Sequence, residues 1–355
     1  MKHTAALLSL VLPLLAACAL WAGPPEPAER TVRMMTHDSF DISEEVLNIF
    51  ESQHDARVEI FQAGDAGVVV NQAILTKDNP LADVLYGVDN TLLGRALDAG
   101  IFEPYQSPML DAIPEHLQLD HQHRVLPVDY GDVCLNYDRA WFESEGLAPP
   151  TTLQDLTRPE YQDLTVVQSP ATSSPGLAFM LATIGHFGET GSYTWLDYWA
   201  DLRDNGVLVT EGWSEAYYEH FTYGSGRTGT RPIVVSYASS PPVEVHFSDE
   251  PFDQAPTGVV VGDGSCFRQV EFVGVLVGAE NADLAREWID FMLSVTFQED
   301  IPLHMFVFPA NEKAELPPVF AEFAVVPESP VTVEYTTIEA NRRPWIDAWT
   351  ETVLE

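Results

Sequence analysis

Basic residues are scarce in this sequence. Its 355 residues include 17 Lys and Arg against 54 Asp and Glu, which gives a formal net charge of −37 at pH 7. A chain this acidic repels nucleic acid and anionic membrane surfaces, so neither is expected as a partner. The charge suits solubility at high salt or at a cell surface, and it is also compatible with a cationic ligand. The hydrophobic fraction of 46% excludes a disordered chain.

Long apolar runs are missing too. The run over residues 5–17 is too short to span a bilayer and has the form of a signal-peptide core. It ends in "LAAC", the pattern of a bacterial lipoprotein signal, in which Cys18 becomes the lipidated N-terminus. Plain signal cleavage is the alternative. We expect a signal peptide over 1–17, a Pro-rich tether over 18–30, and an exported protein that is lipid-anchored on the outer face of the cytoplasmic membrane.

Cysteine is nearly absent from the rest of the chain. Only Cys134 and Cys266 follow Cys18. An even pair in an exported protein favours one disulfide, here between segments far apart in sequence. Neither cysteine has a second Cys or a His at metal-ligand spacing, so no zinc site is expected.

Catalytic motifs are also lacking. Ser225 in "YGSGR" does not have the strand–elbow–helix context of a hydrolase nucleophile. The serines of "QSPATSSPG" have no nearby His and no Ser-x-x-Lys spacing, and the ten His residues are scattered. Paired carboxylates for glycosidase chemistry stay open, but nothing singles out a pair. We expect no enzymatic activity, no metal and no cofactor.

The chain does contain regular strand–helix alternation. Strand-like segments begin near residues 31, 56 and 81, and a helical pattern follows each, which predicts a mostly parallel sheet flanked by helices. Polar residues end these strands: His37 and Asp38, then Asp65, then Asp89 and Asn90. Ligands of open α/β sheets bind beyond the carboxyl ends of the strands. Helix N-capping is the simpler role for any one of these residues.

Two long alternating segments, 123–142 and 266–278, suit the crossover strands of a two-lobe protein, since the chain is too long for one core. Cys134 and Cys266 would then join these strands at the hinge. We expect residues 31–131 with 267–312 to form lobe 1, residues 132–266 to form lobe 2, and a C-terminal helical segment, 313–355, to pack on the lobes.

Aromatic rings and carboxylates occur together in "LVTEGWSEAYYEH", residues 208–220. The residues concerned are Trp213, Tyr217 and Tyr218, with Glu211 and Glu215. Tyr237 ends another strand-like run in the same predicted lobe. Rings at strand ends belong either to the core or to a cage for a flat cation, where one ring contributes ~2 kcal/mol or more. Ser173 and Ser174 precede a helix, where hydroxyls and free N–H groups cap the helix or anchor a polar ligand.

Several motifs in order, among them "GDAGVVVNQAIL", "VDYGDVCLNYD", "SPATSSPGLAFML", "EGWSEAY" and "VSYASSPP", resemble the thiamine-binding subunit of bacterial ABC importers. The resemblance covers about residues 31–352. It implies an α/β fold of two lobes, the periplasmic-binding-protein fold (type II-like). Each lobe would be a mostly parallel sheet flanked by helices, and two crossover strands would join them.

The resemblance also implies a ligand-binding set. Its members are Asp65, Ala66 (where the family can have Gly), Ser173, Ser174, Trp213, Tyr237, Ala238, Ser239, Ser240, Pro241 and Phe306. Two positions depart from the family: Val243 replaces a Tyr found in some members, and Phe306 replaces a Trp. No Lys or Arg belongs to the set, so no strong demand for a phosphate is expected.

The expected function is a monomeric receptor that captures thiamine, with its phosphates as further candidate ligands, and delivers it to an ABC permease and its ATPase subunit. One alternative is a receptor of the same fold for iron or another cation, such as a polyamine. Another is a secreted thiamine-degrading enzyme, for which a disulfide-bonded Cys134 could not serve as nucleophile.

Overall fold

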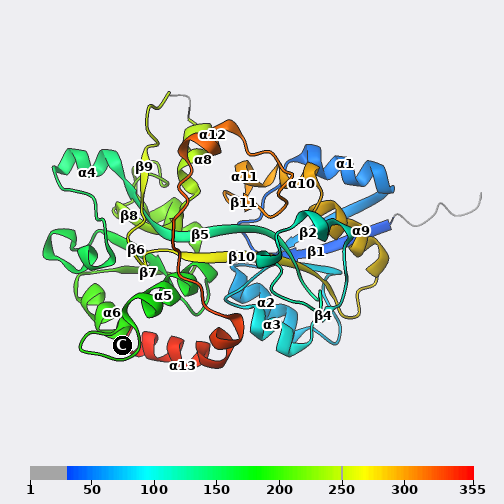
Figure 1. Cartoon of the computed structure of the whole chain (residues 1–355), viewed down its shortest axis with the longest axis horizontal. Coiled ribbons are helices and arrows are strands. Elements are labelled where there is room, and N and C mark those ends of the chain that lie inside the picture. The colour runs from blue at the N-terminus through cyan, green and yellow to red at the C-terminus, as the bar shows by residue number, and fades with distance from the viewer. Residues whose placement is uncertain (1–29, 249–250) are drawn as a thin grey trace, which may run out of the picture.

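The computed structural model describes residues 30–248 and 251–355. Two lobes lie side by side, and two long strands run through the middle of both (Figure 1). The expected signal peptide, Cys18 and nearly all of the tether lie outside the described residues. Within the described part of the chain, no helix combines the length and the apolar character needed to cross a membrane.

The strands form one hydrogen-bonded network. Their bounds are β1 Arg30–Thr36, β2 Ala56–Gln62, β3 Val84–Asp89, β4 Phe102–Glu103, β5 Leu126–Asp138, β6 Thr165–Gln168, β7 Leu208–Thr210, β8 Ile233–Tyr237, β9 Thr257–Val260, β10 Phe267–Leu276 and β11 Phe308–Pro309. The order is β2-β1-β3-β10-β5-β8-β6-β7, with β4, β9 and β11 off this path. β1 is parallel to β2 and β3, and β6 is parallel to β7 and β8. This confirms a mostly parallel sheet in each lobe.

Helices cover the sheet of each lobe (Figure 1). Their bounds are α1 Glu44–His54, α2 Ala66–Leu75, α3 Leu93–Ala99, α4 Arg139–Glu145, α5 Ser174–Phe187, α6 Trp195–Asp204, α7 Trp213–Glu215, α8 Ser240–His246, α9 Ala282–Met292, α10 Val295–Gln298, α11 Ile301–His304, α12 Pro318–Phe323 and α13 Tyr335–Val353. Local signals set their ends: Ser43 caps α1 by accepting from the Val46 N–H, and Gly100 ends α3 in the left-handed region. We call β1–β3 with α1–α3 and α9 the first lobe, and β6–β8 with α4–α8 the second.

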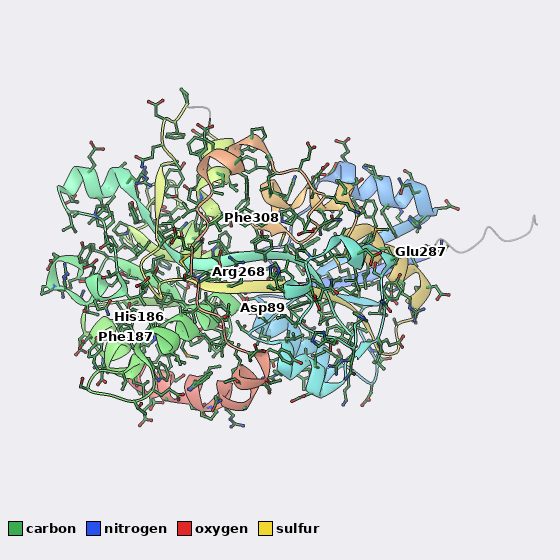
Figure 2. The ribbon with its side chains drawn as sticks, in the orientation of Figure 1. Asp89, His186, Phe187, Arg268, Glu287 and Phe308 are labelled. Atoms are coloured by element: carbon green, nitrogen blue, oxygen red, sulfur yellow. A yellow bond between two sulfur atoms is a disulfide. The ribbon has the colours of Figure 1, made fainter. Side chains whose placement is uncertain are left out.

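The crossover strands β5 and β10 carry the hydrogen bonding from one lobe to the other. β10 is antiparallel to both β3 and β5, and β5 is antiparallel to β8. Toward the second-lobe end of this pair, where Arg268 is opposite Asp132, the Arg268 guanidinium (labelled in Figure 2) bonds both oxygens of Asp132 at 2.6 and 2.9 Å. Cys134 and Cys266 form a disulfide. It lies at the second-lobe end of the pair, where Cys134 is already opposite Ser236 of β8, rather than midway between the lobes.

A carboxyl group is buried in the second lobe, on α8. Glu244 accepts hydrogen bonds from the hydroxyls of Tyr217 and Thr257. Burial raises the pKa of Glu244 from its ordinary value of 4.5 to about 8. The folded protein therefore keeps this carboxyl protonated at neutral pH.

We expect Glu244→Gln to change how stability depends on pH. Between pH 4.5 and 8 the folded state holds a proton on Glu244 that the unfolded chain has lost, so stability falls as pH rises through this window. The neutral glutamine lacks this contribution. The unfolding free energy of the wild type, relative to Glu244→Gln, should fall by about 1 kcal/mol per pH unit from pH 5 to 7.

Urea denaturation at pH 5, 6 and 7 measures this difference. The exposed Glu219→Gln is the matched control and should track the wild type at every pH. A constant offset between the wild type and Glu244→Gln would contradict the assignment.

Candidate ligand-binding site

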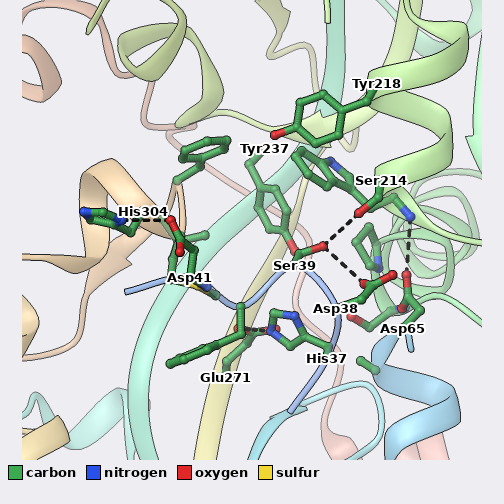
Figure 3. A pocket seen from close by; sticks show the side chains of 18 residues that line it. His37, Asp38, Ser39, Asp41, Asp65, Ser214, Tyr218, Tyr237, Glu271 and His304 are labelled. Atoms are coloured by element: carbon green, nitrogen blue, oxygen red, sulfur yellow. Dashed lines mark hydrogen bonds and ion pairs between the residues drawn. The ribbon is translucent and has the colours of Figure 1, made fainter. Parts of the chain in front are cut away.

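A cavity of about 270 Å³ lies between the lobes. The segment after β1, the start of α2 and β10 line it from the first-lobe side (Figure 3). The starts of α5 and α7 and the end of β8 line it from the second. The lining residues are His37, Asp38, Ser39, Phe40, Asp41, Asp65, Ala66, Ser174, Pro175, Trp213, Ser214, Tyr218, Tyr237, Glu271, His304, Met305, Phe306 and Val307.

Aromatic rings form one wall of the cavity. Tyr217 stacks behind the Trp213 indole, with ring centroids 4.9 Å apart and planes 20° apart. Tyr218 and Phe306 meet the indole edge-on, at 5.4 and 6.4 Å. The indole Nε1 donates to the Ser236 hydroxyl at 3.0 Å. The ring that faces the cavity is therefore fixed in orientation from several sides.

The carboxylates beside these rings are not the ones nearest in sequence. Glu211 and Glu215 do not line the cavity, because the Glu215 carboxylate instead accepts from the Glu211 backbone N–H at 3.0 Å. The proximity in "LVTEGWSEAYYEH" is thus a local turn contact. The lining carboxylates come from outside the second lobe, and they are Asp38, Asp41, Asp65 and Glu271.

Asp65 reaches from the first lobe to the second. It occupies the N-cap position of α2, yet its carboxylate makes no hydrogen bond to that helix. Its Oδ1 accepts from the Ser174 N–H and its Oδ2 from the Trp213 N–H, each at 3.3 Å. Burial raises the pKa of Asp65 to about 6. For this residue, simple helix capping is wrong.

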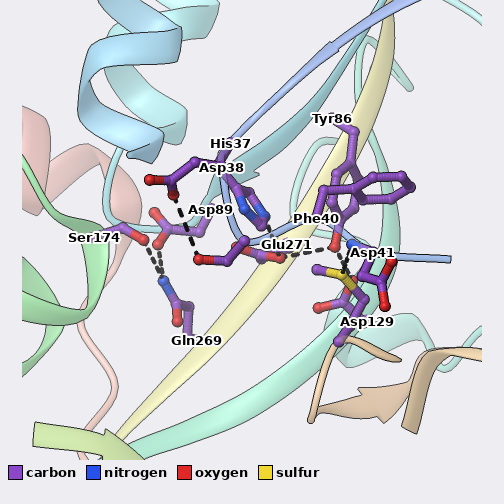
Figure 4. Close-up of polar contacts among 12 residues, drawn as sticks. His37, Asp38, Phe40, Asp41, Tyr86, Asp89, Asp129, Ser174, Gln269 and Glu271 are labelled. Carbon is purple, nitrogen blue, oxygen red and sulfur yellow. Dashed lines mark hydrogen bonds and ion pairs between the residues drawn. The ribbon is translucent and has the colours of Figure 1, made fainter. Parts of the chain in front are cut away.

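Asp89, the other strand-end aspartate, has a local role. Its Oδ1 accepts from the Thr91 and Leu92 backbone N–H groups at 2.9 and 3.2 Å. Its Oδ2 accepts from Gln269, which also bonds the Ser174 hydroxyl (Figure 4). Asp89 does not line the cavity. Asp89 thus holds the turn between β3 and α3 and does not cap α3, whose N-cap position is Leu92.

The floor of the cavity is a buried chain of polar groups (Figure 4). His37 Nε2 lies 3.6 Å from the Glu271 carboxylate. The Tyr86 Oη lies 2.9 Å from Glu271 and 2.5 Å from Asp129. A hydroxyl has one hydrogen to donate, so one of these two contacts requires a proton on a carboxyl group. Gly87, with φ of 94°, makes room here, because a Cβ on it would lie 2.4 Å from the His37 ring.

Electrostatics assign that proton to Asp129. Burial, with the Glu271 charge adding to it, raises the pKa of Asp129 well above its usual range. Burial would lower the pKa of His37, but the Glu271 carboxylate outweighs it and the net shift is upward. Burial would raise the pKa of Glu271, yet His37 lowers it overall. The geometry and these directions point to a His37–Glu271 ion pair and a protonated Asp129 in the floor.

Further polar contacts close the cleft. The Ser39 and Ser214 hydroxyls lie 3.3 Å apart across the lobes (Figure 3). Asp41 is paired with His304 Nδ1 at 2.9 Å. Gly67 of α2 approaches the second lobe so closely that a Cβ on it would lie 2.6 Å from the Thr172 carbonyl oxygen.

The residues expected in the site fall into two groups. Asp65, Ala66, Ser174, Trp213, Tyr237 and Phe306 line the cavity, whereas Ser173, Ala238, Ser239, Ser240 and Pro241 are buried without lining it. Two of the buried group support the wall. Ser239 donates to the Phe306 carbonyl at 2.6 Å, and Ser240 lies 3.1 Å from the Ser236 hydroxyl that holds the indole.

Sequence reasoning missed several lining residues. Glu271 lies in a strand that is buried at every position but one, and it is the one carboxylate of that strand, which is the signal that could have found it. His304 comes from a distant helix and gives no local signal. Val243, which replaces a Tyr of some thiamine-binding subunits, is buried in a cluster with Phe308 and Phe320 and does not line the cavity.

Known proteins are similar to this chain in both sequence and fold. Residues 79–324 match the family described as bacterial extracellular solute-binding protein. A thiamine-binding periplasmic protein of Brucella suis biovar 1 (strain 1330) is 29% identical over 334 residues, which span 92% of this chain and 93% of that protein. The solved structure of a periplasmic thiamin binding protein superposes with a TM-score of 0.79 at 25% identity, over 92% of this chain and 96% of that one.

The fold alone is common to receptors of other specificity. A ferric binding protein from Campylobacter jejuni superposes with a TM-score of 0.71 at 17% identity, over 90% of this chain and 99% of that one. With two lobes, two crossover strands and a cavity between them, the chain belongs to the bacterial extracellular solute-binding protein family.

Proposed function

We propose that this protein binds thiamine in the cavity between its lobes and delivers it to the permease of an ABC importer. One observation carries the proposal: a fixed indole face and its neighbouring rings lie opposite carboxylates, and no Lys or Arg lines the cavity. Thiamine joins a flat aminopyrimidine to a flat thiazolium cation. The names of the two thiamine-binding proteins similar to this chain support the same ligand.

The charges of the cavity suit a cation. The Glu271 carboxylate lies beside His37, and the Asp41 carboxylate lies beside His304. Asp38 and Asp65 add two further carboxylates to the lining. A cation over the face of a tryptophan gains about 2 kcal/mol when it is desolvated. The aromatic wall and these carboxylates together would offset the thiazolium charge as the ligand leaves water.

The other candidate ligands and activities would need different groups in the cavity. Ferric ion needs several oxygen or nitrogen ligands at one point, and among residues 30–248 and 251–355 no group of three or more His, Cys, Asp and Glu could hold a metal ion. A polyamine would use the same rings and acids as thiamine. A thiamine-degrading enzyme would need a nucleophile in the cleft, and Cys134 is committed to a disulfide. The binding experiment below therefore tests a polyamine, ferric ion and the turnover of thiamine alongside thiamine binding.

We expect calorimetric titration of the protein with thiamine to show 1:1 binding, with no turnover of the ligand. Tyr218, which is 49% exposed at the cavity edge, should contribute to this affinity. Tyr218→Leu should weaken thiamine binding about tenfold, because it removes one ring of the wall. Tyr193→Leu replaces a tyrosine of similar exposure, 38%, that is outside the cavity. It should leave the affinity unchanged.

Spermidine and ferric citrate are titrated in parallel. If spermidine or ferric citrate gives binding heat and thiamine gives none, the cavity is the site of that other ligand and not of thiamine. Equal losses of thiamine affinity in Tyr218→Leu and Tyr193→Leu would show that the Tyr218 ring does not contact the ligand.

Gly67→Ala should impair binding without impairing folding. The new Cβ would meet the Thr172 carbonyl of the opposite lobe at 2.6 Å, so the closed arrangement must open slightly. Alanine also favours the helix by up to about 1 kcal/mol, so the melting temperature should hold or rise. Thiamine affinity should fall by about tenfold or more. Leu75→Ala, at an 86% exposed position of the same helix, is the control. Unchanged affinity in Gly67→Ala would show that binding does not need this contact.

We also propose that Cys18 carries a lipid that anchors the exported protein, since "LAAC" follows a short apolar run. In a bacterium that expresses the full chain, wild-type protein should partition with membranes, and its N-terminal peptide should carry the mass of the lipid. Cys18→Ala should release the protein in soluble form. Recovery of unmodified wild-type protein in the soluble fraction would favour plain signal cleavage.

A further inference from the structure

Helix α13 packs on both lobes at once. It contacts α3 of the first lobe and α6 of the second, and in Figure 1 it lies beside α6 and reaches toward α3. The segment before it is paired with the start of β10: the Val331 N–H donates to the Cys266 carbonyl at 2.8 Å, and the Val331 carbonyl accepts from the Arg268 N–H at 3.0 Å. The lobes are therefore linked by α13 as well as by β5 and β10.

The first turns of α13 lie against α3. Gly94, the second residue of α3, is buried in this contact. A Cβ on Gly94 would lie 2.6 Å from the Glu339 Cβ and 3.1 Å from the Tyr335 carbonyl oxygen. Glycine lets two backbones approach this closely because it has no side chain. Since a carbonyl oxygen and a Cβ cannot rotate away, any side chain at Gly94 would displace α13 itself.

The last turns of α13 are held by the second lobe. The Trp349 ring is fully buried and meets the Trp199 ring of α6 edge-on, with centroids 5.4 Å apart and planes 81° apart. The Trp345 Nε1 donates to the Glu189 carboxylate, in the segment between α5 and α6, at 2.9 Å. This part of α13 is thus attached to the second lobe by packing and by a hydrogen bond.

Pro344 lies between the two attached parts of the helix. Tyr335 and Glu339, on the first-lobe side, come before it, and Trp345 and Trp349, on the second-lobe side, come after it. A proline inside a helix has no N–H for the carbonyl four residues earlier, and its ring crowds that carbonyl, so helices bend most readily there. The residue at which α13 bends most readily therefore lies where the helix passes from one lobe to the other.

We infer that α13 is a strap that links the two lobes and limits how far the cleft between them opens. Because each part of α13 is attached to its own lobe, separation of the lobes must bend the helix at Pro344 or pull Tyr335 and Glu339 away from Gly94. No residue of α13 is among those that line the cavity, so the strap acts on the lobes and not on the ligand.

The strap should nevertheless affect ligand binding. A ligand that contacts both lobes binds the closed arrangement, and its apparent affinity falls in proportion to the fraction of the protein that is closed. Loosening the strap favours the open arrangement and should weaken binding. The effect on thiamine affinity rests on the proposed function, whereas the restraint on the lobes does not.

One variant at each end of the strap tests the inference in the full protein. Gly94→Ala displaces α13 from α3, and alanine favours the helix in which it lies, so the fold should be kept. Glu189→Ala removes the acceptor of the Trp345 hydrogen bond from an exposed position. The matched controls are Asp98→Ala, at an exposed position of α3, and Arg343→Ala, whose side chain on α13 is 89% exposed.

Small-angle X-ray scattering of the ligand-free protein measures the separation of the lobes, calorimetry measures thiamine affinity, and melting temperatures verify that the variants fold. The radius of gyration should exceed that of the wild type in Gly94→Ala and, to a lesser degree, in Glu189→Ala. Thiamine affinity should fall about fivefold in Gly94→Ala and about twofold in Glu189→Ala. Both controls should match the wild type, and saturating thiamine should return the radius of gyration of Gly94→Ala to the wild-type value.

The other outcomes separate the strap from the proposed function. An unchanged radius of gyration and affinity in both Gly94→Ala and Glu189→Ala would overturn the strap and leave the proposed function standing. Equal changes in Gly94→Ala and Asp98→Ala would trace the effect to α3 alone and would also overturn it. If the wild type does not bind thiamine, the proposed function fails, and the radius of gyration of the variants still decides whether α13 restrains the lobes.

Discussion

The antiparallel pairing of β5 with β10 is the interaction on which the rest of the structure depends. These two strands take part in the sheets of both lobes, so β3 and β8, which pair with them, are fixed relative to each other. The carboxyl ends of the parallel strands in the two lobes consequently meet at one cleft. Any opening of that cleft must be absorbed by twist in this pair, where Arg268 holds Asp132 and lies over the Tyr130 ring at 5.2 Å. The disulfide, at the second-lobe end, leaves the first-lobe half of the pair outside its constraint.

The balance of charge in the cavity differs from that of the chain as a whole. The chain as a whole carries a formal charge of −37, yet the buried floor is balanced by a proton on Asp129 and an ion pair between His37 and Glu271. A charge buried without a partner would cost several kcal/mol, which explains why the acids of the floor are neutralised within the protein. The remaining negative charge, at Asp38 and Asp65, lies where a ligand can reach it. The local field is therefore set by a few side chains and not by the overall acidity.

Much of this arrangement could be predicted from the sequence. The alternation of strands and helices, the two long crossover segments and the places of Trp213 and Tyr237 at strand ends follow from hydrophobic period and strand-end position, which are local properties. The family resemblance, and not the pattern, singled out Asp65 among the strand-end acids. The partners of those residues are not local. Glu211 and Glu215 lie beside Trp213 in sequence, but the carboxylates that share its cavity come from 148 or more residues away or from β10. Asp65 and Asp89 look alike as strand ends, and only the second lobe, which supplies N–H donors to one and not to the other, separates their roles.

The resemblance to thiamine-binding subunits has the same limit for a related reason. The "SYxxSP" turn, Ser236 to Pro241, contributes one lining residue, Tyr237. Its other members act behind the wall: Ser236 holds the Trp213 indole, Ser240 lies against Ser236, and Ser239 fixes the Phe306 backbone. A motif of this kind preserves the orientation of a ring that stands elsewhere in the sequence. Phe306, a lining ring, forms part of the surface offered to the ligand, while its backbone is held by Ser239. Support for the ring and contact with the ligand are thus carried by separate residues, so the family motif indicates where the rings are held, and the ligand contacts have to be read from the cavity.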